Sequence, residues 1–211
     1  MPRPRVHDLD AMLDAAETLV GAGGPAALTL RNLAHTTGAP VGTLTHAFGS
    51  RDALVARLWL RAARSFLERQ EDRVAAALPA SPVAATVAAA LTPLVLLAER
   101  PAAAAVLLGY RREDLLRPGA VTGELHAVEG RFVALLVRLA EALWSRRDAG
   151  AVETVTVCVV DIPTGLLRRH LRSGRGVPPG TARHLRAAVD GVLSLGPPPS
   201  RKDTPSAHTR P

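Results

Sequence analysis

The chain has 211 residues, of which 47% are hydrophobic and 3% aromatic, and its formal net charge at pH 7 is +7. This length allows one large domain or two small ones, and the core must be built mainly from Ala, Leu and Val. Cys158 is the single cysteine, which excludes a disulfide framework and fits a reducing cytoplasm. We expect no secretory signal, because the N-terminal residues contain no long apolar stretch, and no membrane span, because the uncharged residues 74–98 are rich in alanine and interrupted by three prolines.

The first half of the chain predicts six helices in order. Helical spacing indicates a first helix at about residues 8–20, which the glycine-rich residues 21–25 end. Residues 30–49 read as two short helices joined by a tight turn. A fourth helix at about residues 51–78 begins after a Ser50 cap, a fifth after Ser81 and Pro82, and a sixth runs from Pro101 to Gly109. The charged residues 110–114 then form a connection.

The second half predicts three more helices and a tail. Residues 123–147 follow helical spacing. The β-branched residues 154–162 alternate as a strand does, but their apolar positions also advance by three and four, and no partner strand exists, so we expect a helix. A last helix carries Leu185 and Val189 on one stripe. The stripes of these last two helices either form a bundle shared between two copies or face their own core. Residues 196–211 are expected to be disordered.

The chain is organised around residues 30–49, LRNLAHTTGAPVGTLTHAFG. Gly38 lies where a left-handed residue would end the first helix, and Pro40 lies where the second helix would start. Leu44 and Phe48 give the second helix a buried edge. The residues that remain on its outer side are Val41, Gly42, Thr43, Thr45 and His46. Residues 30–51 carry two arginines and no acid, so this slim surface is suited to a DNA major groove.

The residues Leu28-Thr29-Leu30-Arg31, Leu33-Ala34, Gly38, Thr43-Leu44, His46, Phe48, Ser50-Arg51-Asp52 and Leu54 resemble the DNA-binding domain of the TetR family of transcriptional regulators. The resemblance covers about a quarter of the chain. It departs from the family pattern at Thr45, where Tyr is usual, at Ala39-Pro40, where a Ser N-cap is usual, and at Arg51, where Lys is common. These departures weaken or remove two of the family's usual phosphate contacts.

The resemblance implies an all-α protein with a three-helix helix-turn-helix domain at residues 1–50 and a helical effector-binding and dimerisation domain at residues 51–195. It implies a dimeric regulator, most often a repressor, that binds a palindromic DNA operator and responds to a small apolar ligand. Thr29, Arg31 and Arg51 are expected to position the DNA backbone, beside the five outer residues of the second short helix. We place the ligand among the larger inward side chains of the later helices, which are Trp59, Phe66, Leu94, Phe132, Leu136 and Trp144.

We found no residue pattern that predicts catalysis, a cofactor or a metal site. His126 and Glu129 lie three apart on one expected helix, but no second such pair accompanies them, so a solvated helix face explains them better. The glycines at residues 21–24 follow a helix rather than a strand, which excludes a phosphate-binding loop. Two alternatives stay open: a helical ligand-binding or scaffold protein whose DNA contacts have decayed, and a helical enzyme.

Overall fold

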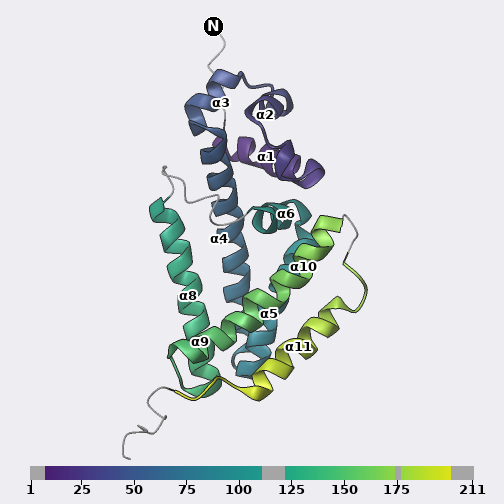
Figure 1. Cartoon of the computed structure of the whole chain (residues 1–211). Helices are drawn as coiled ribbons and strands as arrows, with labels where there is room; N and C mark the ends of the chain where they lie inside the picture. Colours follow the sequence, from purple (N-terminus) through teal and green to yellow (C-terminus); the bar gives the residue numbers. More distant parts are fainter. Residues whose placement is uncertain (1–7, 111–121, 174–176, 201–211) are drawn as a thin grey trace, which may run out of the picture. The chain divides into compact units, whose positions relative to one another are not determined.

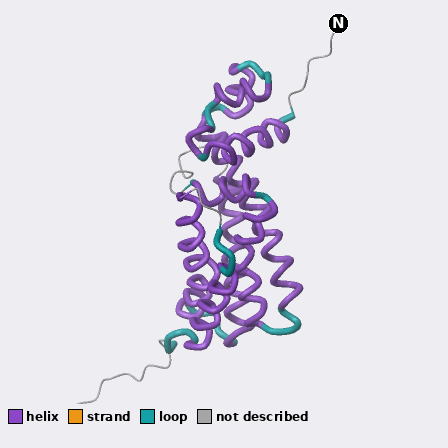
Figure 2. The backbone as a smooth tube through the Cα atoms, turned by 90° about the vertical axis from the view of Figure 1, so that its right-hand side faces the viewer, coloured by secondary structure: helices purple, strands orange, loops and turns teal. Residues whose placement is uncertain are grey.

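The computed structural model describes residues 8–110, 122–173 and 177–200, and within these ranges it contains helices and no strand (Figure 2). The all-α prediction is therefore confirmed. The expected tail begins at residue 196, and residues 196–200 are irregular. The remainder of that tail at residues 201–211, and residues 111–114 of the charged connection, lie outside the described residues.

The helices follow one another along the chain as labelled in Figure 1. They are α1 (Leu9–Gly23), the short 3₁₀ turn η1 (Pro25–Ala27), α2 (Leu30–Thr37), α3 (Val41–Phe48), α4 (Arg51–Ala77), α5 (Pro82–Glu99), α6 (Pro101–Gly109), α8 (Thr122–Trp144), α9 (Ala149–Thr156), η2 (Val157–Asp161), α10 (Ile162–Ser173) and α11 (Thr181–Leu195).

Helix starts lie where short polar side chains predict them. The Ser50 hydroxyl accepts a hydrogen bond from the Ala53 N–H at 3.1 Å, and the Ser81 hydroxyl accepts one from the Val83 N–H at 3.2 Å. Each bond satisfies a backbone donor that the first turn of a helix leaves without an internal partner. Pro40 differs by one position from the expectation, because it is the N-cap of α3 rather than its first residue.

The β-branched residues 154–162 are helical, as the advance of their apolar positions by three and four predicts. They include a wider π-turn, η2, where the Ile162 N–H donates to the Val157 carbonyl five residues back. Pro163 follows directly and lacks the N–H that an α-helix would direct to the Val159 carbonyl. The π-turn therefore lies where proline interrupts the regular hydrogen-bond ladder.

The chain divides into two compact units. The first comprises Met1–Glu68 and Pro93–Gly130, and the second comprises Arg69–Thr92 and Arg131–Pro211. In the second unit Leu185 and Val189 are buried within their own chain, with 1% and 0% of their surface exposed. The prediction of a stripe shared between two copies is therefore wrong for these two residues, because the fold uses them for its own core.

Two helical stretches, Pro82–Glu99 and Ala149–Arg168, are long and apolar enough to cross a membrane by length and composition. This is weak evidence for a span, because core helices of soluble proteins satisfy the same criterion. Thr86 and Thr92 on α5 are fully buried, and their hydroxyls donate to the carbonyls of Pro82 and Ala88. Within the protein, 44% of the first stretch and 39% of the second are buried.

Candidate nucleic-acid interface

The turn between α2 and α3 is fixed by local backbone chemistry. Thr29 caps α2 by accepting a hydrogen bond from the Asn32 N–H at 3.0 Å. Gly38 ends α2 in the left-handed conformation, with φ of 68°, which costs glycine little because it has no Cβ. The Thr37 hydroxyl donates to the Leu33 carbonyl and accepts from the Ala39 N–H, which closes the turn. The three-residue connection thus sets how α3 leaves α2.

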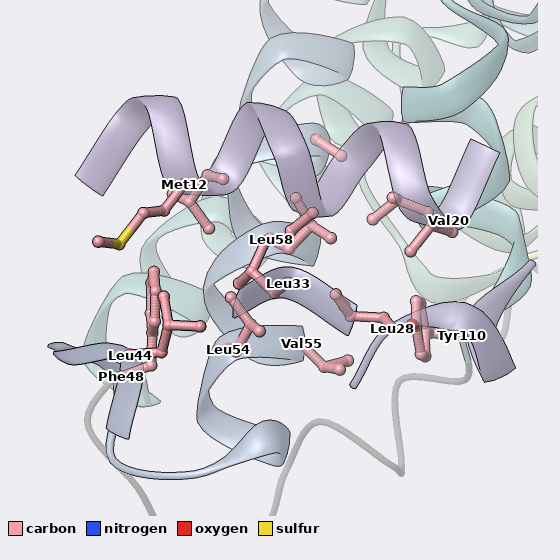
Figure 3. Packing of buried hydrophobic residues seen from close by; sticks show 14 of the residues in the cluster. Met12, Val20, Leu28, Leu33, Leu44, Phe48, Leu54, Val55, Leu58 and Tyr110 are labelled. Atoms are coloured by element: carbon pink, nitrogen blue, oxygen red, sulfur yellow. The ribbon is translucent and has the colours of Figure 1, made fainter. Parts of the chain in front are cut away.

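The inner edge of α3 is seated on a hydrophobic core that belongs to the first unit. Leu44 and Phe48 are 0% and 4% exposed. Figure 3 shows Leu44 and Phe48 together on the side of Met12 of α1, and Leu33 of α2 belongs to the same cluster. Burying such side chains contributes about 1.5–3 kcal/mol each. The packing fixes which face of α3 is turned outward.

The outer face of α3 presents the side chains that the sequence indicated. Val41, Gly42, Thr45 and His46 are exposed, and Thr43 is half-buried. The Thr45 hydroxyl donates to the Val41 carbonyl at 3.0 Å, one turn back on the same helix. The five predicted contact residues of α3 therefore lie on one small helix face without a carboxylate.

Of the three expected backbone-positioning residues, Arg31 is exposed in the first turn of α2, and Thr29 is half-buried in its capping role. Arg51 is placed differently. Its Nε donates to the Leu28 carbonyl at 2.7 Å and its Nη2 donates to the Pro25 carbonyl at 3.1 Å. Two of its nitrogens therefore brace the segment that connects α1 to α2, and its role toward DNA stays a prediction.

Three contacts tie α6 and Tyr110, which follows it, to α1, η1 and α4 in the first unit, and sequence reasoning missed them. The Trp59 indole N–H donates to the Leu107 carbonyl at 3.3 Å. The Tyr110 hydroxyl donates to the Pro25 carbonyl at 3.3 Å. Burial raises the pKa of Tyr110, and the nearby positive charge of Arg51 lowers that pKa by a smaller amount. A Cβ placed on Gly21 of α1 would lie 2.7 Å from the Ala102 Cβ, so these helices approach closely.

A cluster of charges joins α1, α4 and the start of α6 in the same unit. The carboxylate of Glu17, a residue 8% exposed, accepts hydrogen bonds from Arg61 at 2.9 Å and from Arg100 at 3.0 Å. Arg61 also pairs with Asp14 at 2.7 Å, and Arg100 donates to the Ser65 hydroxyl at 3.3 Å. The side chains lie up to 83 positions apart in the sequence, which is why no local signal pointed to them.

The six residues expected to surround a ligand do not gather in one unit. Trp59, Phe66 and Leu94 belong to the first unit, where Trp59 and Phe66 pack against hydrophobic clusters. Phe132, Leu136 and Trp144 belong to the second unit. A separate shallow apolar hollow of about 230 Å³ in the second unit contains none of the six. Its lining comprises Gly150, Glu153, Thr154, Val157, Val192, Leu195, Gly196 and Pro198.

Two further features of the second unit bear on ligands. Gln70 is 0% exposed, and its side-chain N–H donates to the Ala89 carbonyl at 3.0 Å, while its Oε1 has no partner among the described residues. A buried acceptor without a partner is costly. Among the same residues, no group of three or more His, Cys, Asp or Glu side chains is placed to hold a metal ion, and Cys158 is buried.

Comparison with known proteins connects this geometry to a family. Residues 12–58 match the family described as "Bacterial regulatory proteins, tetR family". These residues contain α2 and α3 together with most of α1 and the start of α4. A search of the curated proteins found no match.

Solved structures share the fold over most of their length. The chain is similar to the multidrug binding protein EbrR complexed with imidazole, with 22% identity, 94% of this chain and 96% of that chain covered, and a TM-score of 0.58. It is similar to a TetR-family transcriptional regulator from Streptomyces coelicolor, with 19% identity, 89% and 98% covered, and a TM-score of 0.64. It is also similar to the transcriptional regulator FadR from Bacillus subtilis in complex with stearoyl-CoA, with 15% identity, 89% of this chain and 97% of that chain covered, and a TM-score of 0.63.

Proposed function

We propose that this chain, whose residues 12–58 belong to the tetR family of bacterial regulatory proteins, is a cytoplasmic transcriptional regulator that binds a two-fold DNA operator as a homodimer. It acts as a repressor, and a small apolar ligand releases it from the operator. The observation that carries the proposal is the exposed, acid-free outer face of α3, seated on a packed core within the family match.

The charge pattern supports DNA as the partner. No acidic residue lies between Leu30 and Arg51, whereas Arg31, His35 and His46 are exposed there. Positive and neutral side chains avoid repulsion from the phosphates, and an exposed arginine at the start of α2 is suited to a phosphate contact. An α-helix with small side chains enters the major groove without a steric conflict.

The two-fold symmetry of operators supports the dimer, because two linked helix-turn-helix units bind two half-sites with an affinity that one unit cannot reach. Its surface must differ from the buried stripe of Leu185 and Val189. The opposite face of α11 exposes Ala187 and Gly191, which are small enough for a second copy to pack closely. We assign the dimer contact to this outer face of α11.

The effector is supported by what similar proteins bind. EbrR is a multidrug binding protein crystallised with imidazole, and FadR was crystallised with stearoyl-CoA. In this chain Phe132, Leu136 and Trp144 on α8 supply apolar surface in the second unit, and the unpaired carbonyl oxygen of Gln70 offers a hydrogen-bond acceptor there. A mainly apolar molecule would release the DNA by binding the free form of the protein more tightly than the DNA-bound form.

The experiment measures binding of the purified chain to labelled DNA from the region flanking its own gene, by fluorescence anisotropy over a range of salt concentrations. Gly42→Glu places a carboxylate on the outer face of α3, and Gly130→Glu places one on α8. Both glycines are exposed helical positions where an added Cβ meets nothing within 4 Å. We expect Gly42→Glu to abolish specific binding and Gly130→Glu to preserve it. Equal affinity of the two variants would refute the proposal.

A second candidate function is a helical ligand-binding or scaffold protein that no longer reads DNA. It is favoured by Arg51, whose donors are directed to backbone carbonyls, and by Thr45, whose hydroxyl donates to its own helix. This candidate predicts the same weak, salt-sensitive binding to every duplex. Sequence-selective binding in the assay above would exclude it.

A further inference from the structure

The outer face of α3 lacks the side chains that most often read purines. Bidentate recognition of guanine uses Arg or Lys, and bidentate recognition of adenine uses Asn or Gln. The sequence of α3 is VGTLTHAF, which contains none of these four residue types. His46 is its single side chain with a nitrogen donor, and the Thr45 hydroxyl is already directed to the Val41 carbonyl. Thr43 is half-buried, so base selection by α3 depends in large part on apolar contact.

Val41 is the apolar group in position to make that contact. It is the first residue of α3 and is 47% exposed, whereas Leu44 and Phe48 on the same helix are buried. Gly42 follows it and contributes no side chain, and an added Cβ there would meet nothing within 4 Å, so the start of α3 beside the valine is open. The start of a reading helix is the part that reaches base edges in helix-turn-helix proteins.

We propose that Val41 reads the C5-methyl group of a thymine in each operator half-site. This inference rests on the proposed function and specifies the class of DNA site that the reading helix selects. The thymine methyl is the one apolar feature that a base pair presents in the major groove. When an exposed valine contacts the thymine methyl group, no hydrogen bond is lost. When the same valine lies against cytosine, it covers the amino group of the base without offering that group an acceptor.

The test begins with a duplex of about 30 base pairs, selected from a randomised pool by binding to the full-length protein, which is long enough for two half-sites one helical turn apart. Each thymine pair related by the two-fold symmetry is then replaced in turn by deoxyuridine, which removes the methyl group and leaves base pairing intact. Affinities are measured for the unmodified protein, for Val41→Ala and for Val133→Ala. Val133 is a matched exposed valine on α8, with 53% of its surface exposed.

We expect one symmetric replacement to weaken binding of the unmodified protein and of Val133→Ala by about fifteenfold, or about fourfold for each methyl group, which corresponds to about 0.8 kcal/mol of apolar burial. With Val41→Ala the same replacement should change the affinity less than about twofold, because the methyl group has lost its contact. Circular dichroism checks that the variants remain folded.

Two results would overturn the inference and leave the proposed function intact. One is a selected duplex in which no deoxyuridine replacement weakens binding, and the other is an effect of equal size in Val41→Ala and in the unmodified protein. Failure to select any sequence from the pool would overturn the proposed function itself, and the thymine assignment with it.

Discussion

Arg51 allows the structural and the DNA-binding roles of a basic residue to be separated. The sequence suggested a phosphate contact for this side chain, and the structure places its Nε 2.7 Å from the Leu28 carbonyl and its Nη2 3.1 Å from the Pro25 carbonyl. Both acceptors lie in the segment between α1 and α2, and Leu28 itself is 0% exposed. We expect Arg51→Ala to act mainly by loosening this segment.

The magnitude follows from the two hydrogen bonds. A bond from a charged donor contributes about 1.5–3 kcal/mol, and more exposed bonds contribute less. The Arg51 side chain is 42% exposed, and its second bond is at the surface, so we expect a total loss of about 2 kcal/mol in the free energy of unfolding. For a chain of this size the loss lowers the melting temperature by about 4–8 °C.

The assay compares Arg51→Ala with Arg31→Ala, because Arg31 is exposed and no hydrogen bond of its side chain braces the fold among the described residues. Thermal unfolding measures stability, and operator binding is measured against salt concentration. Arg31→Ala should leave the melting temperature unchanged and lower the salt slope by about 1.8 for a dimer, one phosphate contact per half-site. Arg51→Ala should lower the melting temperature and leave the slope within error.

The opposite pattern would refute the reasoning. If Arg51→Ala unfolds at the temperature of the unmodified protein and its salt slope falls, the guanidinium binds phosphate and the two carbonyl contacts contribute little. Arg51→Lys sharpens the comparison, because lysine keeps the charge but cannot hold two carbonyls with a planar fork. It should restore part of a phosphate contact and little of the stability.

Three further predictions concern the core and its titrating groups. Val189→Glu should unfold the protein, because it buries a charge at a position where the native side chain is 0% exposed. Ala187→Glu, on the outer face of α11, should remain folded and sediment as a monomer. A Val189→Glu variant that is folded by circular dichroism would contradict the first expectation. Burial raises the pKa of Tyr110 above its ordinary value of 10.0, so the unfolded chain ionises first and stability should fall as the pH rises past about 10; in urea titrations Tyr110→Phe should show a smaller fall, since the buried thiol of Cys158 contributes a fall of the same sign. Burial also raises the pKa of Cys158 from 9.0 to about 11, which leaves less of the reactive thiolate at pH 8. Alkylation by iodoacetamide at pH 8 should therefore be at least about a hundredfold slower in the folded than in the unfolded protein. Equal rates would show that the thiol is accessible.

The features that the sequence predicted correctly are those that neighbouring residues determine. The Thr29 cap, the left-handed Gly38 and the Ser81-Pro82 start each depend on residues within one helical turn. The helical conformation of residues 154–162 was also predictable, but from the spacing of the apolar positions rather than from the β-branched composition. Periodicity reports which face is buried, and burial outweighs the small intrinsic preference of single residues.

Contacts between distant segments were not predictable in the same way. Leu185 and Val189 show the helical spacing of a buried face, but spacing does not say whether a face meets its own core or a second copy. Arg51 was read as a phosphate ligand because its position matched a family pattern, and its carbonyl partners lie 23 and 26 residues away. Trp59 was predicted to line a ligand pocket, which stays a prediction, and no local signal indicated that its indole N–H would donate to the Leu107 carbonyl.

These long-range contacts bear on how a signal reaches the DNA-reading helix. Leu54 and Leu58 of α4 are 0% exposed and belong to the same hydrophobic cluster as Leu44, so the seat of α3 includes the start of α4. The Glu17 carboxylate binds Arg61 of α4 and Arg100 at the start of α6, which adds α6 to the same unit. Glu17 is the more buried member, with 11% of its side chain exposed against 26% for Arg61 and 39% for Arg100, so removing either arginine costs less than breaking a fully buried pair. A change that displaces the start of α6 must therefore either break the Glu17–Arg100 pair or carry α1 with it, and α1 contributes Met12 and Leu13 to the core beneath the α3 reading face.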